Sequence, residues 1–296
     1  MSSLQTGRAG SVRGIGTRLT LAFRRRKIAR TPIAIAAWLA LAFFLFVVVF
    51  GPLLVSADPV TQDAAPLLFP GSPGHLLGTD ELGRDQLSRI VHGAAPLVSV
   101  ALLATLFACV VGVAIGLLAG FLGGWVDQIL MRFTDVGLAF PSILIIVLTV
   151  TVAGSNASAL IIGIGIAMIP SFARLSRALA AREAVKDYVL AAKLGGASLP
   201  RILTVEIMPN LLGPVLVQIV STISVSAGFA AGLSYLGLGI QPPQPDWGYM
   251  VQAGQEFIYT APRLVIIPAI CTVAFVAACN FVGDDLRDAL DPRTQQ

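Results

Sequence analysis

Long apolar stretches alternate with short polar ones along the chain, and their lengths indicate membrane-spanning helices. A helix needs about 20 apolar residues to cross about 30 Å of hydrocarbon. Such stretches cover residues 33–55, 94–120, 133–153, 157–172, 211–238 and 264–282. We expect the fourth to end near Pro170, and the break before it at residues 154–156 predicts a tight turn. The pattern predicts an all-α, polytopic membrane protein with about six transmembrane helices.

The composition agrees with a membrane protein. Hydrophobic residues make up 56% of the 296 positions and charged residues 12%, whereas a soluble domain carries about 25% charged residues. A single soluble domain is therefore excluded. The three cysteines, Cys109, Cys271 and Cys279, fall inside apolar stretches and form no CxxC or Cys/His pattern. They indicate packing residues, and neither a disulfide framework nor a metal site.

The basic residues orient the chain, because cytoplasmic loops are enriched in Lys and Arg. Only Arg84, Arg89 and Arg263 of the 20 Lys and Arg lie on the side opposite to the termini. Both termini are therefore expected in the cytoplasm. The first apolar stretch is too long for a signal peptide and predicts an uncleaved anchor.

This topology divides the chain into five regions. They are a cytoplasmic basic arm (1–32), a first transmembrane helix (33–55), an extracytoplasmic segment (56–93), a core transmembrane domain (94–283) that includes a cytoplasmic loop (173–210), and a cytoplasmic tail (284–296).

Two patterns mark the inside of the predicted bundle. Small residues recur every four positions along and just after the second span, at Gly112, Gly116, Gly120 and Gly124. This spacing predicts a close approach by another helix. The fifth span carries a polar stripe, formed by Gln218, Ser221, Thr222 and Ser226. The stripe either lines an aqueous pathway or hydrogen-bonds a neighbouring helix or its own preceding turn.

Catalytic chemistry is not indicated by the sequence. The predicted spans hold no Asp, Glu, Lys or Arg near their middle, which argues against a carrier driven by protons or sodium ions. The chain has no phosphate-binding P-loop. Its only histidines, His75 and His92, lie in or beside the outer segment. We predict no catalytic, cofactor-binding or metal-binding residue, so any energy must come from another polypeptide.

The polar segment from Arg182 to Asn210 interrupts this apolar chain. Asp187 is predicted to cap a helix over residues 188–194 that stops at Gly195-Gly196. Ser198 is predicted to cap the next helix, with Pro200 in its first turn. A two-turn helix is unstable alone in water and needs a partner surface. Ala191 and Ala192 would form a slim side for a groove, flanked by apolar Tyr188 and Leu194. The alternative is an ordinary connecting loop.

The spacing of Ala191-Ala192, Gly196 and Pro209-Asn210 resembles the cytoplasmic "EAA" loop of ABC importer permeases. The resemblance implies that this loop couples the chain to a separate ATP-hydrolysing subunit. The implied coupling residues are Asp187, Tyr188, Ala191, Ala192, Leu194, Gly195, Gly196, Ser198, Pro209 and Asn210. Leu190 and Glu206 replace the usual Glu and His of the family, and Glu183-Ala184 lies at a different offset.

Further stretches resemble the second (C-type) permease of dipeptide, oligopeptide and nickel importers. They are "HLLGTDELGRDQLSRIVHG", "MRFTDVGLAFPS", "LSYLGLGIQPPQPDWGYM" and "GDDLRDALDPR". The resemblance implies a type I importer (MetI-like) fold, and outer segments that face a solute-binding protein. Those outer residues are Gly78, Thr79, Asp80, Gly83, Arg84, Asp85, Arg89, Pro243 and Trp247. The acidic tail is expected to lie against the coupling loop.

The physical reading of the outer segments gives further expectations. Thr79 or Asp80 is predicted to cap the helix that leads into the second span. The spacing of Asp80, Arg84, Asp85 and Arg89 suits i,i+4 ion pairs, each worth only a few tenths of a kcal/mol. Trp247 and Tyr249 suit an interfacial aromatic belt.

The resemblance implies a non-catalytic permease subunit of an ATP-driven importer in the bacterial plasma membrane, with short peptides as the expected substrates. The implied partners are a related permease, two subunits that hold ATP and Mg, a solute-binding protein and membrane lipid, with no nucleic acid. A nickel chelate or another small solute is the alternative cargo. A secondary carrier and a non-transporting scaffold are the rival functions.

Overall fold

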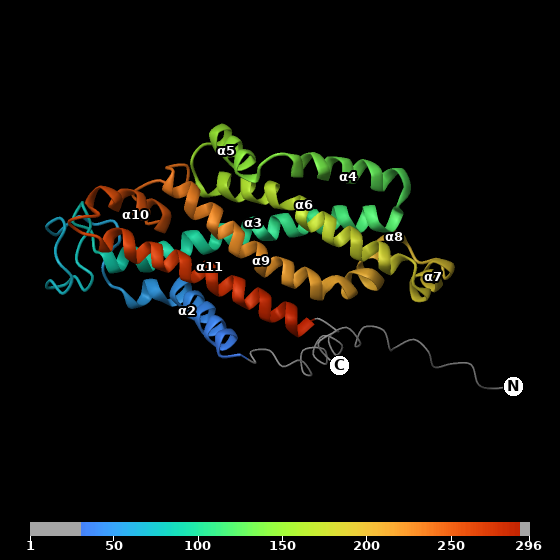
Figure 1. Cartoon of the computed structure of the whole chain (residues 1–296), viewed down its shortest axis with the longest axis horizontal. Helices are drawn as coiled ribbons and strands as arrows, with labels where there is room; N and C mark the ends of the chain where they lie inside the picture. The colour runs from blue at the N-terminus through green and yellow to red at the C-terminus, as the bar shows by residue number, and fades with distance from the viewer. Residues whose placement is uncertain (1–30, 291–296) are drawn as a thin grey trace.

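The computed structural model describes residues 31–290, and within them the protein is a bundle of long helices (Figure 1). The predicted basic arm lies almost wholly outside the described residues, as does the end of the tail. The elements are α2 (Pro32–Leu54), α3 (Gln86–Leu122), α4 (Gly124–Ala139), α5 (Ser142–Ala153), α6 (Ala157–Ala184), α7 (Asp187–Leu194), α8 (Leu199–Arg201), the π-helix η1 (Ile202–Ile207), α9 (Met208–Tyr235), α10 (Trp247–Gly254), the 3-10 helix η2 (Gln255–Phe257) and α11 (Arg263–Leu290).

Five stretches of the described chain are long and apolar enough to cross a membrane, namely α2, α3, α6, the continuous run Leu199–Tyr235, and α11. A sixth is obtained only if α4 and α5 count together, and these two helices are bent by 88° at their junction. The predicted span over residues 133–153 is therefore present only as part of this bent pair, and not as one continuous helix. Pro141 forces the extended backbone of Phe140, because a proline disfavours helical geometry at the residue before it.

The fourth predicted span extends further than expected. We expected an end near Pro170, but α6 continues to Ala184 and keeps Pro170 buried inside the helix. Residues 173–184, the first part of the predicted cytoplasmic loop, therefore belong to α6. An interior proline normally costs a helix about 3 kcal/mol or more. Packing against α3 along most of the length of α6 accounts for the continuation.

Helices α3 and α6 approach closely through three glycines. A Cβ atom added at Gly112 would lie 2.7 Å from the carbonyl oxygen of Ile169, and one at Gly116 would lie 2.4 Å from that of Ala173. One at Gly120 would lie 2.5 Å from the oxygen of Arg177. The predicted close approach is confirmed at these three positions.

The fourth glycine of the pattern has another role. Gly124 has φ +56° and nothing within 4 Å of an added Cβ. Together with Gly123, at φ +62°, it forms the turn between α3 and α4. These backbone angles are costly for residues other than glycine.

The remaining long helices complete the bundle beside this pair. Helix α9 contacts both α3 and α11, and α2 lies along α11. The Phe44 ring of α2 meets Trp247 and Phe275 edge-on, with centroids 6.0 and 5.5 Å apart. The Trp38 indole Nε1 donates to Asp285 Oδ2 of α11 at 3.0 Å.

The predicted tail is not a separate element in the described residues. Positions 284–290 are the last turns of α11. They pack on α2 and α9, where Leu286 joins a small core with Ala37 and Val217. For residues 284–290 this placement differs from the expected position against the coupling loop, and the rest of the predicted tail lies outside the described residues.

Gly116→Ala should destabilise the protein because the new methyl group would overlap the α6 backbone. Overpacking of this kind costs about 1–3 kcal/mol. We expect a lower apparent melting temperature for the variant purified in detergent. Gly228→Ala in α9 is the matched control, since an added Cβ there meets nothing within 4 Å. Equal melting temperatures for both variants would contradict the close α3–α6 contact.

Candidate functional site

Helix α7 projects at the end of the bundle where α6 ends and α9 begins (Figure 1). Lys186 occupies its N-cap position, and no side chain makes a cap hydrogen bond there. Asp187 is therefore the first helical residue, and the expectation that it caps the helix is wrong. Its carboxylate still lies beside the positive end of the helix dipole.

The end of α7 is a Schellman turn. Gly195 is the C-cap and Gly196 has φ +73°. The Gly196 amide donates to the Lys193 carbonyl at 3.0 Å, and the Ala197 amide donates to the Ala192 carbonyl at 3.1 Å. The predicted glycine stop is confirmed.

The helix after this turn, α8, begins at the expected residue but lacks the expected cap hydrogen bond. Ser198 occupies the N-cap position of α8 and Pro200 lies in the first turn, yet the Ser198 side chain makes no cap hydrogen bond. A π-helix follows, and Pro209 stands at the start of α9. The segment from Asp187 to Asn210 is thus one short helix, α7, joined by a tight turn to the beginning of the continuous helical run Leu199–Tyr235.

The two alanines of α7 lie in different environments, which corrects the expectation of one slim face. Val189 is fully buried, and Ala192 packs partly buried against the chain's own core. Ala191 is exposed and lies beside Leu190 and Leu194, the latter 91% exposed. The outward surface of α7, formed by Leu190, Ala191 and Leu194, is small and apolar. We call it the α7 outer face.

Tyr188 ties α7 to both neighbouring long helices. Its hydroxyl donates to the Glu183 carboxylate at the end of α6 and accepts from Asn210 Nδ2 of α9 at 3.0 Å. Asn210 Nδ2 also donates to the Glu206 carbonyl at 2.8 Å. Burial and then the hydrogen bond to Glu183 raise the pKa of Tyr188. The protonated hydroxyl therefore links α7 to the end of α6 and to the start of α9.

Sequence reasoning missed two members of this arrangement. Glu183 was set aside because of its offset, but it accepts from Tyr188 and from Lys186 Nζ, the latter at 2.6 Å. Phe121 of α3 lies under Lys193, with Nζ 4.3 Å from the ring centroid. The spacing Glu183–Tyr188 is no helical repeat, because a turn separates α6 from α7, so no periodic signal marked the pair.

The polar stripe of α9 lies mainly between helices. Ser226 is fully buried, and its hydroxyl lies 3.2 Å from that of Thr105 in α3. Thr222 is buried and accepts from Gln218 Nε2 at 3.3 Å. Within this chain Ser226 therefore contacts a neighbouring helix, and Thr222 contacts the preceding turn of its own helix. Gln218 and Ser221 are partly buried, and their pathway role stays a prediction.

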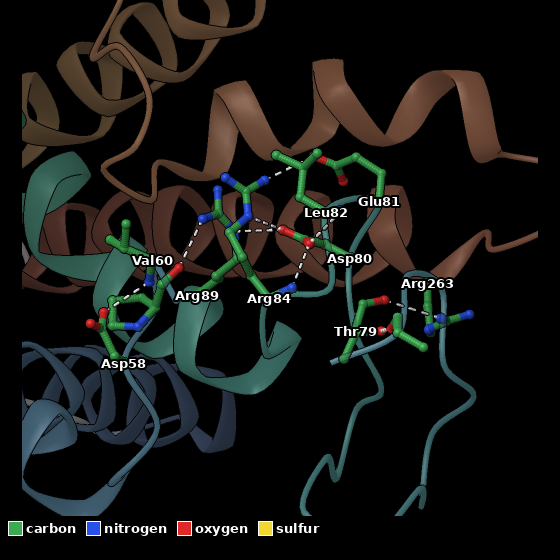
Figure 2. A network of polar contacts seen from close by, with 11 residues as sticks. Asp58, Val60, Thr79, Asp80, Glu81, Leu82, Arg84, Arg89 and Arg263 are labelled. Atoms are coloured by element: carbon green, nitrogen blue, oxygen red, sulfur yellow. Dashed lines mark hydrogen bonds and ion pairs between the residues drawn. The ribbon is translucent and has the colours of Figure 1, made fainter. Parts of the chain in front are cut away.

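The opposite end of the bundle carries a network of buried charges centred on Asp80 (Figure 2). Asp80 Oδ2 accepts from Arg84 Nε at 2.6 Å and lies 3.2 Å from Arg89 Nε. Its Oδ1 accepts from the backbone amides of Leu82 and Arg84, each at 2.9 Å. The predicted pairing of Asp80 with Arg84 is confirmed, but the pair is buried in a loop and does not lie on a helix surface.

Asp85, rather than Thr79 or Asp80, caps α3. Its carboxylate accepts from the Ser88 amide at 2.7 Å and pairs with His75 Nδ1 at 2.9 Å. The expected cap at Thr79 or Asp80 is therefore wrong, because the tight turn around Gly83 delays the start of the helix until Gln86.

Two further links attach the outer loop to the bundle. Arg263, at the start of α11, donates to the carbonyls of Leu68 and Thr79 at 2.7 and 3.3 Å. Arg89 donates to the Pro59 carbonyl at 3.0 Å. Added Cβ atoms at Gly78 and Gly83 would lie 2.1 Å from loop carbonyl oxygens. The loop is thus fixed to the first turns of α3 and α11.

Trp247 is a packing residue rather than part of an interfacial belt. It is 1% exposed, and its indole donates to the Ile90 carbonyl at 2.8 Å. Asp246 caps α10 through the Tyr249 amide, and burial raises the pKa of its carboxyl. Pro243 is exposed in the non-helical stretch before α10. The wide indole fits here because Gly93 presents no side chain to it.

The family model described as "Binding-protein-dependent transport system inner membrane component" matches residues 112–296. The dipeptide transport system permease protein DppC of Haemophilus influenzae is 37% identical, covering 88% of this chain and 91% of its own. The di/tripeptide transport system permease protein DppC of Pseudomonas aeruginosa is 38% identical over 88% of each chain.

Other relatives widen the comparison. The glutathione transport system permease protein GsiD of Pectobacterium atrosepticum is 36% identical over 90% of this chain and 89% of its own. A structure of the MetNI methionine ABC transporter in an inward-facing conformation superposes with a TM-score of 0.54 at 18% identity. It covers 69% of this chain and 97% of that one. This likeness establishes the MetI-like fold.

Asp80→Asn should destabilise the outer end strongly, because Arg84 and Arg89 would remain buried beside a neutral amide. Removing one partner of a buried ion pair costs about 3–5 kcal/mol. We expect a large fall in the apparent melting temperature of the purified protein. Glu81→Gln is the control, because Glu81 is more exposed and makes only one of the contacts to Arg84. A comparable small shift in both variants would show that the Asp80 network contributes little.

Proposed function

This chain belongs to the family of inner membrane components of binding-protein-dependent transport systems, and we propose that it is the permease subunit of an importer of short peptides. The proposal rests on the names of relatives that match nearly the whole chain. Those of Haemophilus influenzae and Pseudomonas aeruginosa are named for dipeptide and di/tripeptide transport. The glutathione relative widens the range to a modified tripeptide. A nickel chelate or another small solute remains the alternative cargo.

The proposed complex contains a related second permease, two ATP-binding subunits on the cytoplasmic side and an extracytoplasmic solute-binding protein. ATP and Mg would be held by the ATP-binding subunits, so this chain would not itself be catalytic. The α7 outer face supports such a docking, because its eight-residue helix exposes Leu190, Ala191 and Leu194 beyond the end of the bundle. A helix this short needs contacts beyond its own turns.

The proposed mechanism follows from how α7 is attached. Closure of the ATP-binding subunits would move α7, and the Tyr188 hydroxyl joins that helix to the end of α6 and the start of α9. Long helices transmit such a displacement because they are stiff along their axes. The pathway between the two permeases would then alternate between outward and inward openings.

The proposed location is the bacterial plasma membrane with both termini in the cytoplasm. The distribution of Lys and Arg supports this orientation, since within residues 31–290 the only such residues at the end of the bundle opposite to α7 are Arg84, Arg89 and Arg263. All three arginines donate hydrogen bonds at that end, to Asp80, to the Pro59 carbonyl and to the Leu68 carbonyl. These hydrogen bonds account for the presence of three basic residues on the side that is otherwise poor in Lys and Arg.

Ala191→Arg should prevent ATP-dependent uptake of a labelled dipeptide by the co-expressed transporter, because the long cation would obstruct the α7 outer face. We expect at least a tenfold loss of uptake and weaker co-purification of the ATP-binding subunits, with normal insertion of the chain. Ala191→Ser is the matched control and should transport normally. Ala192→Arg tests a different contact, because Ala192 faces the chain's own core and its replacement should disturb the loop itself.

Normal uptake and normal ATPase co-purification with Ala191→Arg would contradict the coupling role of α7. Uptake that persists without the ATP-binding subunits, and that an uncoupler stops, would instead indicate a secondary carrier. Normal peptide uptake by cells that lack this chain would support the scaffold alternative.

Fusions to alkaline phosphatase should report the orientation, because the enzyme is active only outside the cytoplasm. We expect activity for a fusion after Asp63, in the outer segment, and none for a fusion after Lys193, in α7. Expression levels measured by immunoblot are the control. The reverse pattern would overturn the proposed orientation.

A further inference from the structure

A charged groove opens between α4 and α6, well away from the polar stripe of α9. It has a volume of about 450 Å³ and is lined by Met131, Asp135, Arg174 and Arg177. Arg174 NH2 donates to Asp135 Oδ1 at 2.8 Å, and Arg177 forms a bidentate pair with Asp127 of α4. The sequence alone indicates no role for these four charged residues.

The position of the groove calls for water or protein beside it. Arg174 lies 17 residues after the start of α6 at Ala157, which is about 26 Å along the helix axis at 1.5 Å per residue. Counted from the first residue of α6, Arg174 therefore lies near the far end of a span of about 30 Å. Charged side chains at such depths almost always face a bundle interior or an aqueous cavity, because lipid exposure is costly.

The Arg174–Asp135 pair has unused hydrogen-bonding capacity. A guanidinium has five N–H donors and a carboxylate has two oxygen atoms, yet one hydrogen bond joins this pair. Their side chains are 57% and 52% exposed. Ion pairs this exposed are worth about 0–1 kcal/mol, so the pair can separate at little cost and each charge can take a new partner.

The charges around the groove favour a zwitterionic ligand. The charges of the lining are those of Asp135, Arg174 and Arg177, and the Asp127 carboxylate outside the lining neutralises Arg177 through the bidentate pair. An anionic lipid headgroup would need a net positive site and apolar walls for its chains, but Met131 is the only apolar side chain in the lining. A short peptide carries one carboxylate and one ammonium group, which match the two members of the Arg174–Asp135 pair.

We propose that this groove is a transit site for short peptides, in which Arg174 binds the peptide carboxylate and Asp135 binds its ammonium group. The inference rests on the proposed function as a peptide importer, and it adds the part of the chain that contacts the cargo. The Arg177–Asp127 pair, which is bidentate and less exposed, holds α4 against α6 and keeps the groove in shape. Weak, exchangeable contacts suit a site that a substrate must leave again.

Protection of an engineered thiol tests the site. Met131→Cys is introduced into the full transporter in lipid nanodiscs, and its reaction rate with a small hydrophilic thiol reagent is measured without nucleotide. We expect millimolar Ala-Ala to slow the labelling at least threefold. The doubly blocked N-acetyl-Ala-Ala-amide should not slow it. The unmodified chain gives the background from Cys109, Cys271 and Cys279.

Two variants complete the design. Phe133→Cys places the thiol on another side of α4, at an exposed position outside the groove lining, and Ala-Ala should not affect its labelling. Arg174→Gln, combined with Met131→Cys, should abolish the protection and slow Ala-Ala uptake. Stimulation of ATP hydrolysis by the loaded binding protein should persist in that variant, whereas a merely structural role would lower recovery of the complex.

Three results would overturn the proposal: equal protection by the blocked peptide, protection that survives Arg174→Gln, or protection that depends on phosphatidylglycerol rather than on peptide. The last result would assign the groove to a lipid. A separate uptake assay keeps the two proposals apart. Absence of Ala-Ala uptake by the unmodified transporter counts against the proposed function, whereas normal uptake without protection of Met131→Cys counts against the groove alone.

Discussion

Helices in a bilayer gain nothing from hiding apolar side chains from lipid tails, so they must be held together by short-range contact. In this chain that contact is the packing of α3 on α6 through Gly112, Gly116 and Gly120, where backbones meet without side chains between them. The pair is long enough to reach both ends of the bundle. Because α3 packs against α6 over this length, α6 continues past Pro170 to Ala184. The segment from Asp187 to Asn210 therefore begins beyond the end of this helix pair.

The two ends of this helix pair are built differently. At one end the Asp80 network, the Asp85 cap and Arg263 fix the outer loop with buried, charge-assisted hydrogen bonds. At the other end α7 is attached by the buried side chain of Val189, by the hydrogen bonds of the Tyr188 hydroxyl and by a glycine turn. Buried charge networks resist deformation, whereas a glycine turn permits it. The displacement of α7 in the proposed mechanism would therefore meet fewer buried polar contacts than a displacement of the outer loop.

The sequence predicts most of this architecture because the strongest signals are local. Apolar length marks the spans, and glycine spacing marks both the α3–α6 contact and the stop at Gly196. What it could not predict depends on partners distant in the chain: the burial of Ser226 against Thr105, the continuation of α6, and the inward position of Trp247. The spacing predicts that Asp80 forms ion pairs. It does not predict that Asp80 is buried, because the turn that buries it has no periodic pattern in the sequence.

The break between α4 and α5 distinguishes the two sides of the bundle. Phe140 and Pro141 are exposed and non-helical between two apolar helices, and such backbone is not tolerated in contact with lipid. Helix α2, on the side of α11, is by contrast unbroken and presents Leu39, Phe43 and Phe46 outwards. The α2 side therefore suits lipid, and the α4–α5 side suits contact with the related permease of the proposed complex. The charged groove between α4 and α6 opens beside that break, where a peptide would pass.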